Sequence, residues 1–175
     1  MKAILALLTG VALTVAAVPA SAETATLLGV FGSWTALQTG SGSSMTCFAR
    51  SEPRATRPAS IKRAKDKTYL LISDWPGRKV KNEPQIVYGY QGNEKGPAAL
   101  GIGPDKFTFF IRNNGKDGAS WLYSLADNPR LIDAMKSGVS AVASGTPVKG
   151  AKTVDTYSLQ GFGDALEKIH AACQM

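Results

Sequence analysis

Glycine and proline interrupt this sequence so often that most of the stretches between them are only long enough for β-strands. The chain of 175 residues contains 18 Gly and 9 Pro. Short runs rich in aromatic and β-branched residues lie between them, such as Thr68 to Trp75, and Phe107 to Arg112 alternates before the turn signal Asn113-Asn114-Gly115. Both features are typical of strands joined by tight turns. The pattern predicts an all-β domain of about seven or eight short strands.

Two segments show helical spacing instead. In the first, near 128–137, Asp127 or Asn128 can cap the helix and Pro129 suits its first position. In the second, near 162–173, apolar residues recur every three or four positions: Phe162, Ala165, Leu166, Ile169, Ala172 and Cys173. We therefore expect a short helix and a C-terminal helix beside the strands.

The first 22 residues have the three-part pattern of a secretory signal peptide. Lys2 gives a positive start, Ala3 to Val18 is uncharged and mostly apolar, and Ala20-Ser21-Ala22 supplies small residues for cleavage. A membrane anchor is the alternative, but the apolar run is shorter than the ~20 residues of a spanning helix. No internal repeat or linker follows. We expect residues 23–175 to form a single exported, periplasmic domain without a transmembrane segment.

Export changes the interpretation of Cys47 and Cys173, because two thiols in an oxidising compartment usually end as one disulfide. A bridge between them would close a loop over most of the chain. In the chain-entropy model so long a loop stabilises the fold by roughly 4–5 kcal/mol. Two separate buried thiols are the alternative, and we favour the Cys47–Cys173 bridge on the redox compartment alone.

Positive charge is concentrated in one segment of the chain, which as a whole has 20 Lys+Arg against 13 Asp+Glu. Between Arg50 and Lys81, only Glu52, Asp66 and Asp74 oppose the basic residues. Such a segment can attract phosphate, a sulfated glycan, lipopolysaccharide or anionic lipid. The alternative is a solvated loop whose lysines keep the edge of a sheet from pairing with other chains and aggregating. The candidate anion- or partner-binding residues are Arg54, Arg57, Lys62, Arg63, Lys65, Lys67, Arg78, Lys79 and Lys81.

Residue types that carry catalysis and metal binding are sparse. With one His and two Cys, a zinc site is improbable, and any Ser-His-Asp triad would have to recruit His170. His170 lies beside the apolar stripe of the expected C-terminal helix, which favours a structural or surface role. Gly101-Ile102-Gly103 lacks the third glycine of a dinucleotide fingerprint. We expect no catalytic, cofactor or metal site and no nucleic-acid partner, with a hydrolase built on Asp or Glu pairs as the enzymatic alternative.

Three tryptophans are candidates for either the core or a binding groove. Core packing is favoured for Trp34, Trp75 and Trp121, because large aromatic side chains are mostly buried. In a groove their rings would stack on a ligand instead.

Two blocks of sequence are similar to one protein family. Phe31-Gly32-Ser33-Trp34-Thr35 lies near the mature start. Leu131 to Gly138 is followed by Thr153 to Phe162, and then by Ala165-Leu166, Ile169 and Ala172-Cys173. In order and spacing the chain resembles the invasion-associated locus B protein family, from about Leu27 to Cys173. The resemblance implies an exported cell-envelope protein with an immunoglobulin-like β-sandwich, and it supplies no catalytic residues.

Two positions depart from the family's pattern. Ser33 replaces the usual Asp beside Trp34. Many relatives also carry a cysteine just after this tryptophan, where the present chain has Ala36-Leu37-Gln38. If that cysteine normally pairs with the counterpart of Cys47, then Cys47 must pair with Cys173 or remain free.

The resulting hypothesis is an exported, non-enzymatic protein that binds an anionic envelope or host-surface component and contributes to host-cell interaction. The alternative is a structural or chaperone-like periplasmic protein that maintains the envelope through apolar contacts. The family's name describes a phenotype, and a shared fold does not transfer it. Binding in the first case would weaken with salt, whereas in the second it would depend on exposed aromatic residues.

Overall fold

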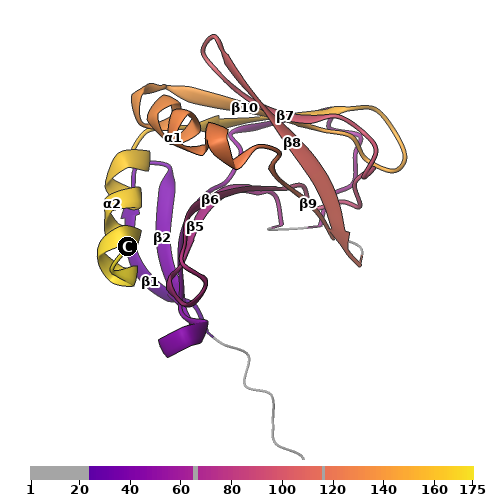
Figure 1. The fold of residues 1–175 in the computed structure, drawn as a ribbon. Helices are drawn as coiled ribbons and strands as arrows, with labels where there is room; N and C mark the ends of the chain where they lie inside the picture. The colour runs from indigo at the N-terminus through magenta and orange to yellow at the C-terminus, as the bar shows by residue number, and fades with distance from the viewer. Residues whose placement is uncertain (1–23, 65–66, 116) are drawn as a thin grey trace, which may run out of the picture.

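The structure is a computed structural model that describes residues 24–64, 67–115 and 117–175 (Figure 1). The signal peptide expected over residues 1–22 and the candidate binding residue Lys65 lie outside these ranges. The strands are β1 (Thr26–Phe31), β2 (Trp34–Thr39), β3 (Thr46–Ser51), β4 (Ala55–Arg57), β5 (Tyr69–Trp75), β6 (Val80–Val87), β7 (Ala98–Ile102), β8 (Asp105–Asn114), β9 (Asp117–Leu122), β10 (Ser140–Gly145) and β11 (Thr153–Ser158). The helices are α1 (Asn128–Ser137) and α2 (Phe162–Cys173), with short 3-10 turns η1 (Gly42–Ser44), η2 (Pro76–Arg78) and η3 (Leu125–Asp127).

All of these strands belong to one 11-stranded antiparallel sheet, in the order β1-β2-β3-β5-β6-β9-β8-β7-β10-β11-β4. Figure 1 shows that the sheet curves strongly, with β1 and β2 along one side and β7 and β10 across the top. This architecture confirms the predicted all-β, sandwich-like fold. The described residues form 11 strands, more than the predicted seven or eight. β4 and β7 are two strands that the pattern missed, because they are short runs without alternating aromatic residues.

The turn signals and the helical spacing marked the local elements correctly. Asn113 and Asn114 end β8, where they pair with Gly118 and Asp117 of β9. Gly115 follows directly with a φ of 61°, which favours glycine. Both helices coincide with the predicted ranges, although the Asp127 carboxylate contacts Arg130 at 3.3 Å rather than capping the α1 amides. Neither described helix has the length and apolarity that a membrane crossing requires.

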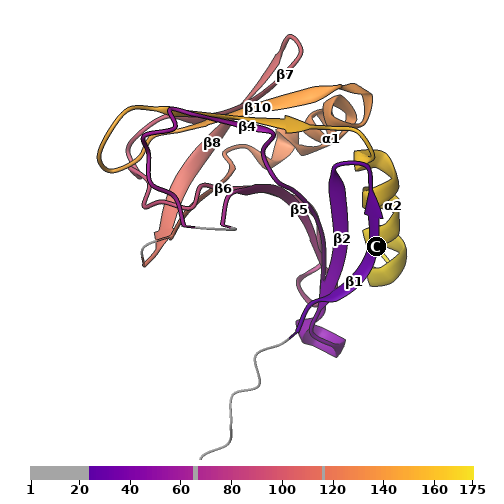
Figure 2. The ribbon, with the colours of Figure 1, turned by 180° about the vertical axis from the view of Figure 1, so that it is seen from behind.

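The core fills the space between the folded-over parts of the sheet and the two helices. α2 packs against β1, β2, β3 and β5, on the convex side of the curve in Figure 1 and, from behind, in Figure 2. Trp34 is fully buried there, donates from Nε1 to the Ser158 carbonyl oxygen at 3.0 Å, and packs on Phe162 with ring centroids 4.9 Å apart. The expectation that Trp34 belongs to the core is confirmed. Neither of the two described helices covers the concave side of the curve.

Candidate functional site

The concave face of the sheet carries a layer of apolar side chains that is separate from the core. Successive residues of a strand point to opposite faces. On β5, Leu70 and Ile72 are buried in the core, whereas Tyr69 and Leu71 belong to a second cluster. We call this second set the concave cluster; it consists of Phe48, Tyr69, Leu71, Val87, Ala119 and Trp121.

The register of the strands aligns side chains into a row across this face. Arg50 on β3 lies opposite Leu71 on β5, which lies opposite Gln85 on β6. Gln85 in turn faces Trp121 on β9, and Trp121 faces Phe110 on β8. Residues directly opposite on antiparallel strands share a face, with Cβ atoms about 4.5–5.5 Å apart. The concave face is therefore one contiguous surface and not a set of separate side chains.

A hollow of about 430 Å³ lies on this face over β2, β3, β5 and β6. We call it the aromatic hollow; its volume lies within the ~300–1,000 Å³ typical of small-molecule pockets. Arg50 is the one charged side chain among the described residues that line it. The lining is Thr39, Ser44, Thr46, Phe48, Arg50, Tyr69, Leu71, Ser73, Trp75 and Gln85.

Polar contacts hold the rings of the aromatic hollow in place. The Arg50 guanidinium carbon lies 5.7 Å from the centroid of the Tyr69 ring, and no carboxylate of the described residues is within 4.0 Å of Arg50. Trp75 donates from Nε1 to Glu83 Oε2 at 3.0 Å, while Arg78 lies over the Trp75 ring at 5.1 Å. Cation–π contacts at exposed sites contribute about 0.5–1 kcal/mol each. The hollow is therefore ordered by the protein's own contacts.

The concave face continues at its β8–β9 end into an exposed apolar patch. Tyr123 and Leu125 are 73% and 77% exposed. They line a smaller hollow together with Phe110 and Trp121, whose rings stack with centroids 6.2 Å apart. Contiguous exposed apolar surface marks a place where another molecule can bind.

The predicted basic binding residues are divided between two ends of the molecule. Arg54 and Arg57 lie at β4, the last strand in the sheet order, whereas Arg78 and Lys79 lie in the turn after β5, where η2 packs against η1. Figure 2 shows β4 along the top, away from the turn that follows β5. Arg78, which lies over the ring of the lining residue Trp75, thus borders the aromatic hollow, and the β4 residues do not. Of the remaining exposed candidates, Lys62 lines a separate hollow with Lys149, and Lys81 lies on β6.

Two of the candidate cations already have carboxylate partners. Arg63 binds Asp155 through Nη1–Oδ2 and Nη2–Oδ1 at 2.9 and 2.7 Å. Burial raises the pKa of Asp155, and Arg63 acts in the opposite direction. Lys67 contacts Asp117 at 2.7 Å on the surface, and this hydrogen bond raises the pKa of Lys67. Arg63 is thus part of the buried structure, and we leave it out of the proposed binding surface.

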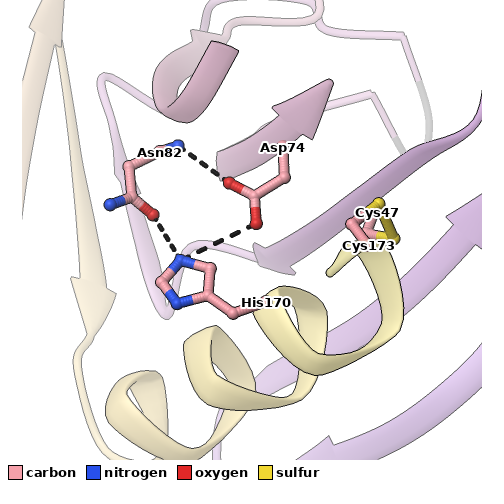
Figure 3. The surroundings of a disulfide bond; sticks show 5 residues. All are labelled: Cys47, Asp74, Asn82, His170 and Cys173. Carbon is pink, nitrogen blue, oxygen red and sulfur yellow. Dashed lines mark hydrogen bonds and ion pairs between the residues drawn. A yellow bond between two sulfur atoms is a disulfide. The ribbon is translucent and has the colours of Figure 1, made fainter. Parts of the chain in front are cut away.

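His170 lies in a polar cluster beside the disulfide (Figure 3). Cys47 and Cys173 are joined with an S–S distance of 2.08 Å, as predicted, and the bond ties β3 to the end of α2. His170 Nε2 lies 2.7 Å from Asn82 Oδ1 and 3.7 Å from Asp74 Oδ2. The backbone N–H of Asn82 donates to Asp74 Oδ1 at 2.8 Å. These contacts hold α2 against the start of β6.

Burial dominates the electrostatics of this cluster. It raises the pKa of Asp74, which is fully buried, against the lowering effects of the Asn82 amide and His170. It lowers the pKa of His170, against the raising effect of Asp74. Across the described ranges, no three His, Cys, Asp or Glu side chains gather closely enough to hold a metal ion. The arrangement agrees with a structural role for His170.

Comparison with known proteins adds one finding about the fold. No family model matches the chain, and no curated protein matches it either. Among solved structures, the chain is similar to the crystal structure of invasion associated protein B from Bartonella henselae, with a TM-score of 0.56 and 13% sequence identity. The match covers 84% of this chain and 98% of that one. It confirms at the level of the fold the resemblance that the sequence blocks indicated.

Sequence reasoning did not select the residues of the concave face. It favoured the core for Trp75 and Trp121, but both are only partly buried and line hollows on the concave side. The sequence did contain one sign of an apolar concave face, because strand β5 is apolar on both sides. Its residues Tyr69, Leu71 and Trp75 alternate with residues of the core. A strand of that kind is either covered on both sides or presents an apolar face to solvent.

Proposed function

We propose that this chain is an exported, non-enzymatic cell-envelope protein that binds an anionic component of the envelope or of a host surface on its concave face. The observation that carries the proposal is the combination of aromatic rings and guanidinium groups on that face, with Arg50 over Tyr69 and Arg78 over Trp75. Aromatic rings supply contact area, and arginine binds anionic groups with a fixed geometry. Neither needs a group that transfers protons, so the surface suits binding rather than turnover.

Export is supported by three observations. Residues 1–22 have the pattern of a signal peptide, and Cys47 is bonded to Cys173, as is typical of oxidising compartments. The fold is similar to that of invasion associated protein B from Bartonella henselae. We infer a periplasmic location, with access to the outer surface and a contribution to host-cell interaction.

The proposal is tested by binding of purified residues 23–175 to lipopolysaccharide, anionic vesicles and heparin at low and high salt. Charge-driven binding weakens as the Debye length falls from about 30 Å at 0.01 M to about 8 Å at 0.15 M ionic strength. The double variant Arg50→Gln/Arg78→Gln removes two cations from the concave face, and Arg54→Gln/Arg57→Gln is its matched control near β4. We expect the first variant to lose binding and the second to keep it. Absence of binding to all three probes, or equal loss in both variants, would contradict the proposal.

A chaperone-like function is the second candidate, and the exposed side chains of Tyr123 and Leu125 favour it. Such a protein would hold apolar segments of other exported chains against this patch. Binding of a reduced, unfolded test protein should then be insensitive to salt and should be lost in Tyr123→Ser/Leu125→Ser. Salt-sensitive binding that this variant retains would exclude the second candidate.

A further inference from the structure

We propose that the aromatic hollow is a subsite for an acidic saccharide, which takes one uronic-acid unit with its carboxylate on Arg50 and its ring against the aromatic wall. The inference rests on the proposed function and names the ligand class of the same site. It depends on the lining of the hollow, on the Arg50 guanidinium, which has no carboxylate partner among the described residues, and on the row of side chains that leads away from it.

The polar part of the lining matches a sugar. Four aliphatic hydroxyl side chains and one amide surround the hollow: Thr39, Ser44, Thr46, Ser73 and Gln85. Hydroxyls and amides both donate and accept hydrogen bonds, as the hydroxyl groups of a sugar ring require. The Ser44 hydroxyl already donates to the Ser41 carbonyl oxygen at 3.0 Å. An acyl chain in the same place would offer no hydrogen bond to the other four groups, which costs free energy for every one that it buries. The lining therefore favours a saccharide over the tail of a lipid.

The apolar part of the lining matches the C–H face of a sugar ring. Phe48, Tyr69 and Trp75 all contribute to the wall of the hollow. Trp75 is held by its hydrogen bond to Glu83, and Tyr69 lies under the Arg50 guanidinium. Side chains that are already fixed lose little freedom when a ligand binds, so these rings are organised for stacking in advance.

The charge of the hollow selects an acidic ligand. Arg50 is its one charged lining residue, and within the described residues no carboxylate neutralises that guanidinium. A guanidinium and a carboxylate form two parallel, charge-assisted hydrogen bonds. The sugar unit in the hollow therefore carries a carboxylate.

The surface beside the hollow can accept further sugar units. From Arg50 the row of opposite residues continues through Gln85 to Trp121 and Phe110, in the direction of the second hollow. Trp121 and Phe110 line this second hollow together with Glu83, so its described lining offers aromatic rings without a cation and suits a sugar unit that is stacked rather than held by its charge. A short chain of sugars lying across β5, β6 and β9 would use both.

The test is calorimetric titration of residues 23–175 with a galacturonic-acid trisaccharide and with its carboxyl-reduced, neutral counterpart. A charge-assisted contact predicts that the acidic sugar binds wild type at least about tenfold more tightly than the reduced one. Arg50→Gln should remove that preference and leave the two sugars equal. Arg57→Gln, an exposed arginine on edge strand β4, is the matched control and should behave as wild type.

The wild-type comparison of the two sugars needs no variant, so the test holds even if Arg50→Gln destabilises the fold. Equal affinity for the acidic and reduced sugars, or an equal effect of Arg50→Gln and Arg57→Gln, would overturn the inference. If neither sugar binds while lipopolysaccharide and anionic vesicles still bind through Arg50 and Arg78, the saccharide inference fails and the proposed function stands. If those probes fail as well, both are overturned.

Discussion

Arg63 and Asp155, separated by 92 residues in the sequence, form a bidentate ion pair inside this protein. The Asp155 side chain is fully buried on β11, and the Arg63 side chain is 12% exposed. Arg63 also donates to the Tyr88 carbonyl oxygen at 3.1 Å and lies over the Tyr90 ring. One arginine of the basic segment thereby fastens the loop before β5 to the far part of the sheet.

Removing one partner of this pair should destabilise the fold strongly. Arg63→Met leaves the buried Asp155 carboxylate without its partner, and we expect the free energy of unfolding to fall by about 3–5 kcal/mol. Lys62→Gln, an exposed neighbour without a contact to Asp155, should change it by less than about 0.5 kcal/mol. Urea unfolding of both variants measures the difference, and equal stability of the two would refute this role of the pair.

Loss of the disulfide should also lower stability. The Cys47–Cys173 bond closes a loop with a sequence separation of 126 and ties α2 to β3. The double variant Cys47→Ala/Cys173→Ala should lose about 2–5 kcal/mol of unfolding free energy, as is usual for a native disulfide. Reductant should destabilise wild type during urea unfolding and leave the double variant unaffected. A wild type that is indifferent to reductant would contradict the prediction.

The His170 cluster predicts a pH dependence of stability. Burial lowers the pKa of folded His170 below its ordinary value of 6.5, so the unfolded chain binds more protons as the pH falls through that value. Stability rises with pH wherever the unfolded state binds more protons, so the contribution of His170 is present above pH 6.5 and is lost below it. The stability difference between wild type and His170→Gln should therefore shrink when unfolding is measured at about pH 5.5 instead of about pH 7.5. A difference that grows on acidification would show the opposite shift.

The raised pKa of Asp74 acts in the other direction. The folded state keeps the Asp74 proton at pH values above 3.8, where the unfolded chain has lost it. The free energy of unfolding therefore decreases as the pH rises from 3.8 through the raised pKa of folded Asp74. Asp74→Asn removes the titration, and its stability relative to wild type should increase over the same rise in pH. The comparison of Asp74→Asn with wild type at several pH values between 4 and 7 checks the sign.

Ser33 offers a test of the position at which this chain departs from the family it resembles. Its Oγ accepts a hydrogen bond from Arg54 Nη2 at 3.1 Å on the surface. The usual Asp at this place would form an ion pair with the same arginine, and we expect Ser33→Asp to stabilise the fold by about 0.2–1 kcal/mol at low salt. The gain should disappear in the Arg54→Gln background and decrease with salt. A gain that survives in that background would show that Arg54 is not its source.

Local chemistry made several elements predictable from the sequence. Asn113-Asn114-Gly115 is a turn signal of three consecutive residues, so the β8–β9 hairpin could be predicted without knowledge of distant residues. The apolar stripe from Phe162 to Cys173 has the period of a helix, and α2 occupies that range. The disulfide followed from the presence of two cysteines in a chain with an export signal. In each case the signal lies within a few neighbouring residues or in the composition of the chain.

The sequence by itself determined that the sheet dominates this fold and that two helices lie near 128–137 and 162–173. The spacing of apolar residues that distinguishes strands from helices is visible in consecutive residues. Only the tertiary structure decided that Arg63 faces Asp155 and that Arg50, Gln85 and Trp121 share one row. These relationships depend on the order of the strands and on their register, and a shift of one residue would turn each side chain to the other face. The sequence shows where the positive charges lie along the chain. Only the curved sheet decides which of them enter buried ion pairs, which lie at sheet edges and which lie on the concave face.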